Sequence, residues 1–169
     1  MKSIAFFVLT LLTLAACGQE DKSKRPSPPA TAKETLNNGV NVLIDYSQPA
    51  VKGRTIGKDL EPMSGKVWRT GANEATVFEV DKNVNIEGKP LPAGKYGLFT
   101  IMNGDEWTII FNKTWNQWGT IYKESEDALR VKVKPGKAKE FSEKMTFTIS
   151  KKGKVTLLWG DLQVDFKVE

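Results

Sequence analysis

The sequence predicts an all-β protein: a single antiparallel β-sandwich, jelly-roll-like, of about ten strands, which follows a signal peptide and a disordered tether. Two observations predict this fold class. Short runs of valine, isoleucine, threonine and aromatic residues are bounded by glycine, proline and asparagine, as strands are bounded by turns. Residues 39–169 have the ordinary length of one domain with a sizeable core, and no internal repeat divides them.

The apolar runs place the expected strands along the chain. The segment 162–168 alternates apolar and polar side chains and is expected to be half buried. The segment 106–112 is apolar on both sides and is expected in the interior. The expected strands are residues 40–46, 66–68, 75–80, 84–86, 96–102, 106–112, 128–134, 144–150, 154–160 and 162–168.

Turn residues connect these strands. Asn103 and Gly104 predict a tight hairpin, because both residue types tolerate positive φ. Glycine-containing turns within 150–154 and 158–162 predict that the last three strands form a meander.

The start of the chain has the pattern of a targeting signal. Residues 4–14 carry no charge but are fewer than the roughly 20 that a permanent membrane helix needs, so residues 1–16 are expected to be a signal peptide. Residues 14–17, LAAC, resemble a bacterial lipobox. The resemblance implies cleavage before Cys17 and acylation of that residue, which would hold the protein on a bilayer without spanning it. An ordinary secretory signal that leaves Cys17 as a free thiol is the alternative.

Residues 17–38 are expected to be the acylated cysteine and a disordered linker. Leu36 is the only large apolar side chain after the cysteine, so this segment has too little apolar surface to fold. Extended at about 3.1 Å per residue, it would hold a domain on the order of 60 Å from the lipid. A glycine directly after the lipobox cysteine, as at Gly18, resembles the pattern of lipoproteins that are sorted to the outer membrane. The pattern leaves open whether the domain faces the periplasm or the cell surface.

Composition excludes several classes of function. The chain has 25 Lys and Arg against 20 Asp and Glu, but its lysines are spread singly and not clustered with aromatic residues as in nucleic-acid-binding modules. It has no histidine, which removes the commonest general base and the usual zinc ligand. Residues 81–87 lack the glycine and closing glutamate of a calcium loop. We expect no nucleic-acid partner, no metal and no cofactor.

The segment 67–76, VWRTGANEAT, combines polar and aromatic residues. We expect residues 70–73 to form a loop between two paired strands, so that Arg69 faces Glu74 across a hairpin. The two side chains would form a partly buried ion pair that fixes the strand register. Two alternatives stay open: Arg69, Asn73 and Glu74 as a clamp for a sugar or carboxylate, and catalysis by Glu74.

The same segment carries a family resemblance. With YSQPAVKGRTIG before it and LPAGKYGLFTI, EWTIIFNK, QWG and DALRVKVKP after it, the chain resembles the bacterial family of domain of unknown function 2911 over about residues 40–168. The resemblance implies a secreted or lipid-anchored β-sandwich, common in Bacteroidota, with no established activity. The sequence departs from the family near Met63, where an aromatic residue is usual. The positions that match the polar signature are Arg54, Trp68, Arg69, Gly71, Asn73, Glu74, Thr76, Asn112, Trp118 and Arg130. All of these except Gly71 and Arg130 are taken as candidate ligand-binding residues.

Two tryptophans, Trp115 and Trp118, lie in the segment WNQWG after a central strand. Exposed aromatic faces stack on sugar rings, so carbohydrate binding is one prediction for this loop. A lid over the open end of the sandwich is the other.

Together these patterns predict a non-enzymatic lipoprotein of the outer membrane. It would bind a ligand or an envelope partner, a glycan or a protein, through the end that carries the segment 67–76 and Trp118. The first alternative is a carboxylate-based hydrolase acting on envelope or extracellular glycan, with Glu74 beside Asp127 or Glu126. The second is a structural or immunity lipoprotein that binds a protein partner.

Overall fold

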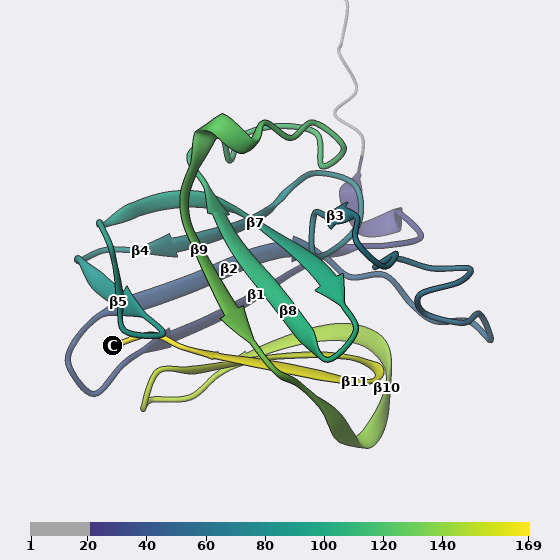
Figure 1. Ribbon diagram of the computed structural model, residues 1–169. Helices are drawn as coiled ribbons and strands as arrows, with labels where there is room; N and C mark the ends of the chain where they lie inside the picture. The colour runs from purple at the N-terminus through teal and green to yellow at the C-terminus, as the bar shows by residue number, and fades with distance from the viewer. Residues whose placement is uncertain (1–20) are drawn as a thin grey trace, which may run out of the picture.

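The computed structural model describes residues 21–169, and the predicted signal peptide and Cys17 lie outside the described residues. The described part of the chain contains eleven strands and two single 3-10 turns, η1 (Lys22–Lys24) and η2 (Glu124–Glu126). The strands are antiparallel and form two layers (Figure 1), so the predicted all-β fold is confirmed. Within residues 21–169, no helix has the length and apolarity needed to cross a membrane.

The larger layer is a seven-stranded sheet in the order β1–β2–β4–β7–β8–β9, with β3 also paired to β7. Its strands are β1 (Pro29–Thr35), β2 (Asn41–Ser47), β3 (Val67–Trp68), β4 (Thr76–Val80), β7 (Gly94–Asn103), β8 (Glu106–Asn112) and β9 (Asp127–Val133).

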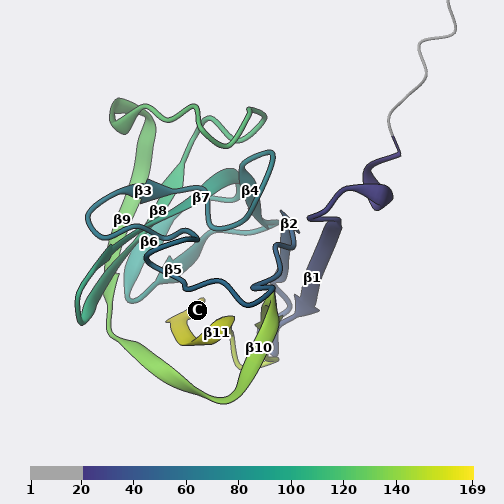
Figure 2. The same cartoon turned by 90° about the vertical axis from the view of Figure 1, so that its right-hand side faces the viewer.

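The smaller layer is one long hairpin, which lies beneath the sheet (Figure 2). Its strands are β10 (Pro135–Ile149) and β11 (Lys154–Lys167). A short hairpin of β5 (Val84–Ile86) and β6 (Lys89–Leu91) completes the fold, and a bridge between Ile86 and Val168 ties it to the end of the chain.

Aromatic side chains join the two layers within a core that also holds many valines, isoleucines and leucines. Phe78 and Phe111 of the sheet meet edge to face with ring centroids 4.9 Å apart, and Phe166 of β11 packs against Phe111 at 5.9 Å. All three rings are buried. Burial of such a side chain stabilises a fold by about 1.5–3 kcal/mol, so these contacts hold the hairpin to the sheet. A second, smaller cluster of Ala75, Phe99 and Ile110 lies apart from this core.

The predicted linker is shorter in the structure than the sequence indicates. Residues 29–35 form β1, paired to β2 from Pro29–Ser47 to Thr35–Asn41. The prediction of disorder up to residue 38 is therefore wrong for this segment. An edge strand gains its hydrogen bonds from its neighbour, and here the small side chains of Ala30 and Ala32 suffice to pack against the core. Apolar content alone could not show this.

The end of the chain also differs from the prediction. Residues 154–167 form one strand, not two, so the predicted meander is wrong. Gly160, at φ 60°, lies opposite Ser142 where the register with β10 shifts, as at a β-bulge. The glycine bends the strand without ending it. The hairpin predicted at Asn103 and Gly104 is confirmed, with Asn103 paired to Glu106 and Gly104 at φ 60°.

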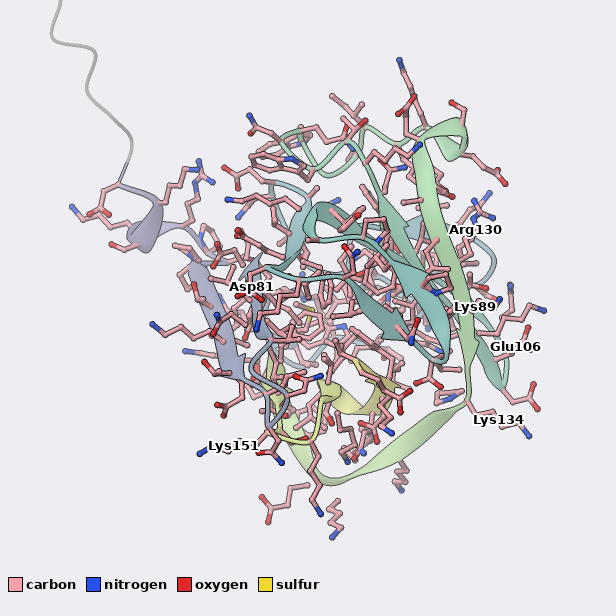
Figure 3. The ribbon with its side chains drawn as sticks, turned by 90° about the vertical axis from the view of Figure 1, so that its left-hand side faces the viewer. Asp81, Lys89, Glu106, Arg130, Lys134 and Lys151 are labelled. Carbon is pink, nitrogen blue, oxygen red and sulfur yellow. The ribbon has the colours of Figure 1, made fainter. Side chains whose placement is uncertain are left out.

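Three surface lysines on different strands and turns lie apart from one another. Lys89, Lys134 and Lys151 are exposed and project at separate places (Figure 3). This is the arrangement of a solvated surface.

Candidate functional site

Residues 69–75, here called the Arg loop, leave the sheet and return to it on the same side of β7. Trp68 pairs with Thr100, and Thr76 pairs with Leu98. Thr100 and Leu98 of β7 are separated by one residue, whereas their partners Trp68 and Thr76 are separated by the seven residues of the Arg loop. The backbone N–H of Thr76 donates to the carbonyl of Arg69 at 3.4 Å and closes the neck of the loop.

The predicted hairpin is wrong, because β3 and β4 both pair with β7 and not with each other. The predicted ion pair between Arg69 and Glu74 is wrong as well, since the carboxylate of Glu74 binds Lys22 and Arg25. The side chains of Arg69 and Glu74 therefore contact different parts of the molecule: Glu74 binds Lys22 and Arg25, and Arg69 lines a pocket.

Several signature residues build the Arg loop itself. Trp68 donates from its indole to the carbonyl of Gly71 at 3.0 Å, and the Thr76 hydroxyl donates to the carbonyl of Thr70 at 2.9 Å. Thr70 and Asn73 have φ of 52° and 58°, a conformation uncommon for residues other than glycine. A Cβ on Gly71 would lie 2.8 Å from the Thr76 hydroxyl oxygen. Trp68 and Thr76 thus shape the site from within, although both were candidates for ligand contact.

A second loop, residues 113–121, lies against the Arg loop and is here called the Trp loop. Glu74 and Trp118 form a backbone bridge, and the Gly119 N–H donates to the carbonyl of Asn73 at 3.1 Å. Gly119 is buried beneath Arg69, and a Cβ on it would overlap the Arg69 Cδ and lie 2.7 Å from the Asn73 oxygen. The structure therefore brings Arg69, Asn73, Glu74 and Trp118 together at one end of the sandwich.

The N-terminal segment docks on the Arg loop. Glu74 accepts hydrogen bonds from Lys22 at 2.9 Å and from Arg25 at 3.0 Å on both of its carboxylate oxygens. The Asn73 side chain donates to the carbonyl of Ser27 at 3.0 Å. The hydrogen bond from Lys22 is the main cause that lowers the pKa of Glu74 to about 2, and the hydrogen bond from Arg25 adds to it.

The other side of the Arg loop forms a pocket of about 180 Å³. The Nε of Arg69 is buried and has no hydrogen-bond partner among the described residues. Burial lowers the pKa of Arg69, and the charge of Glu61 partly opposes this. The pocket is lined by Ser27, Pro49, Arg54, Leu60, Glu61, Trp68, Arg69, Gly71, Ala72 and Trp159.

Arg54 lies in the wall of this pocket and is held by backbone groups. Its Nε donates to the carbonyl of Val51 at 3.1 Å, and its Nη2 donates to the carbonyl of Ala50 at 2.8 Å. The charged side chains of the lining are Arg54, Arg69 and Glu61, so the wall carries one net positive charge. A guanidinium fork in such a wall can bind a carboxylate.

Asn112 belongs to a different cluster, at the junction of β8, η2 and β9. Its amide donates to Asp127 at 2.8 Å and to the carbonyl of Lys123 at 2.9 Å. Asp127 also accepts from Tyr122 at 2.6 Å and from Arg130 at 2.7 Å. Burial and the hydrogen bond to Asp127 raise the pKa of Tyr122 to about 12. This cluster, here called the Asp127 cluster, anchors the segment that follows the Trp loop.

Glu61 and Trp159 are among the pocket residues that the sequence did not predict. The indole of Trp159 donates to the carbonyl of Glu61 at 2.9 Å across 98 positions of sequence. No local pattern could join residues so far apart. Met63, where the sequence departs from the family pattern, is not part of the lining.

No cluster of three or more carboxylates or thiols suited to a metal ion occurs in residues 21–169. Two of the three carboxylates suggested for a hydrolase have separate partners: Glu74 binds the N-terminal segment, and Asp127 binds the cluster around Asn112. With a pKa of about 2, Glu74 stays ionised at neutral pH and is a poor proton donor.

A comparison with known proteins agrees with the resemblance seen in the sequence. The model of the family DUF2911, described as a protein of unknown function, matches residues 27–168. The match begins just before β1, which supports counting that strand as part of the domain. No curated protein and no solved structure matches the chain. The chain therefore belongs to the DUF2911 family.

Proposed function

We propose that this protein is a lipid-anchored, non-enzymatic binding domain of the outer membrane whose Arg69 pocket takes a carboxylate group. The lipobox-like segment that ends at Cys17 supports the anchor. One observation carries the binding site: Arg69 lines the pocket, and its buried Nε has no hydrogen-bond partner within residues 21–169. A buried donor left unpaired costs about 1–3 kcal/mol, and a ligand that accepts from it recovers that cost.

The chemistry of the wall favours a carboxylate. Two arginines and one glutamate leave a single net positive charge, which one carboxylate neutralises. A doubly charged phosphate would be repelled by Glu61. The small volume of about 180 Å³ admits a carboxylate with a few further atoms, such as an acidic sugar or the end of a peptide.

Calorimetric titration of the full chain tests this proposal with acetate, glucuronate, N-acetylglycine, inorganic phosphate and glucose. We expect saturable binding of the carboxylates, weaker binding of phosphate and no binding of glucose. A preference for glucuronate over N-acetylglycine would assign the carboxylate to a glycan, and the reverse preference to a peptide. Absence of carboxylate binding would contradict the proposal and favour a structural or immunity lipoprotein.

Two variants make the titration specific to the pocket. Arg69→Met removes the charged donor, and we expect binding to weaken at least about tenfold, since a hydrogen bond to a charged group contributes about 1.5–3 kcal/mol. Lys58→Met removes one positive charge from an exposed position outside the lining and is expected to bind like the wild type. Equal losses in both variants would indicate an unspecific effect of net charge.

A further inference from the structure

Large apolar side chains gather on the exposed side of the Trp loop. Five large hydrophobic residues are exposed in the described chain, and three of them lie in this loop: Trp115 at 37%, Trp118 at 49% and Ile121 at 52%. Lys95 lies over the Trp115 ring at 5.2 Å and covers part of it. Such a group is typical of an interaction surface, and tryptophan is the residue enriched where a protein meets the interface of a bilayer.

The contacts of the N-terminal segment with the Arg loop limit how far the predicted lipid anchor can lie from the domain. Lys22 and Arg25 bind Glu74, whose backbone bridges to Trp118. Asp21 is four residues after Cys17, and four extended residues span at most about 14 Å. An acyl anchor at Cys17 would therefore be at most about 14 Å from Asp21, and not on the order of 60 Å from the domain as a free tether would place it.

Exposed lysines surround the loop: Lys22 and Lys24 lie in η1, Lys113 begins the loop and Lys123 follows it. Lys22 is paired with Glu74 and Lys24 with Asp21, while the acid Glu124 is paired with Arg130 at 3.1 Å. Lys113 and Lys123 form no ion pair within residues 21–169. Lysines near a bilayer surface attract anionic headgroups, by about 1 kcal/mol each.

The arrangement of the fold agrees with one membrane-facing end. The chain between β8 and β9, which includes the Trp loop, and η1 lie toward the upper end of the sandwich in Figures 1 and 2. Lys151, in the turn between β10 and β11, lies toward the opposite end (Figure 3).

We infer that the Trp loop is a membrane-contact surface: with the chain anchored at Cys17, Trp115, Trp118 and Ile121 rest in the lipid interface. This inference rests on the anchor of the proposed function. The docked segment holds the domain flush with the bilayer by one end, and the β10–β11 turn points away from it.

Fluorescence quenching in vesicles tests this orientation. The acylated full chain is reconstituted in phosphatidylethanolamine and phosphatidylglycerol with acyl chains brominated near the headgroup. Trp68, Trp107 and Trp159 are at most 2% exposed, so quenching by lipid reports on Trp115 and Trp118. We expect a blue shift and a loss of emission in the wild type, and neither change in the double variant Trp115→Phe/Trp118→Phe.

A matched control places a tryptophan at the far end. Lys151→Trp in the double-variant background is expected to remain unquenched, because residue 151 faces away from the lipid. Quenching of that tryptophan as strong as in the wild type would overturn the inference.

The anchor is measured in the same samples by intact mass and by flotation with the vesicles. A chain without acyl mass would overturn the anchor and the orientation together. An acylated chain whose exposed tryptophans escape quenching would overturn the orientation alone. Acetate binding to the double variant reports separately on the Arg69 pocket, and we expect it to equal that of the wild type.

Discussion

Two of the partly buried arginines in the described chain, Arg130 and Arg69, differ in how their side chains are bonded. Arg130 donates to Asp127 at 2.7 Å and to the Tyr122 hydroxyl at 2.7 Å, so its charge is compensated within the fold. Arg69 has no hydrogen-bond partner for its buried Nε in the part of the chain that the structure describes. The polar groups of the Asp127 cluster bind one another and stabilise the fold. In the Arg69 pocket, the Nε–H of Arg69 has no such partner within residues 21–169. This difference separates a structural cluster from a candidate binding site within one domain.

The largest loss of stability is expected from Asp127→Ala. The substitution leaves Asn112, Tyr122 and Arg130 without their common acceptor, and removing one member of a buried ion pair costs about 3–5 kcal/mol. Because Arg130 is about one third exposed, we expect the lower end, about 3 kcal/mol, in urea unfolding. Asp161→Ala, at an exposed position, is the control. A loss no larger than that of the control would show that the cluster is not structural.

The next effect is expected from Gly119→Ala. The added methyl group meets Arg69 and the Asn73 carbonyl, and overpacking of this kind costs about 1–3 kcal/mol. Gly136→Ala is the matched control, since the nearest atom to its Cβ would be 3.8 Å away. Thermal unfolding of the two variants compares them. Equal midpoints would mean that Arg69 does not pack on Gly119.

Glu74→Gln is expected to have a smaller effect on stability, which appears only at acid pH. The pKa of Glu74 is lowered from 4.5 to about 2 in the fold, so its contribution to stability is present above pH 4.5 and is lost as pH falls from about 4.5 to 2. Glu74→Gln removes this titration. We expect the unfolding midpoint of the variant to fall less than that of the wild type between these two pH values. Parallel curves would contradict the docking of Lys22 and Arg25 on Glu74.

The smallest effect on stability is expected from Arg69→Met. It removes a buried donor that has no partner, so the free energy of unfolding should stay within about 1 kcal/mol of the wild type. Arg130→Met, the same substitution in the compensated cluster, is expected to cost about 2 kcal/mol. Chemical denaturation of the pair tests the comparison directly. Equal costs would show that Arg69 also has a structural role.

The sequence predicted the features that depend on local chemistry. Asn103 and Gly104 predicted a hairpin because glycine provides the positive φ that the turn requires, and the apolar segment 106–112 predicted a strand inside the sheet. Gly160 misled the same reasoning, since a glycine at positive φ also fits a bulge within a continuous strand.

The candidate site depended on contacts that local patterns do not encode. The mixture of polar and aromatic residues in segment 67–76 predicts a site. The partners of Glu74, however, are Lys22 and Arg25, which lie in a stretch whose composition predicts disorder. The pocket lining includes Trp159 of β11 and Glu61 of the segment between β2 and β3, which meet only because the fold brings these two parts of the chain together. Pairings of this kind are set by the fold as a whole.

Nuclear magnetic resonance of the arginine side chains tests the central claim most directly. The chain has four arginines, so the Nε–H signal of Arg69 is identified by its loss in Arg69→Met. Titration with acetate is predicted to shift this signal to saturation, because the buried donor gains its acceptor, while the signal of Arg130 stays in place. An Arg69 signal that does not respond to acetate would contradict the account of the pocket.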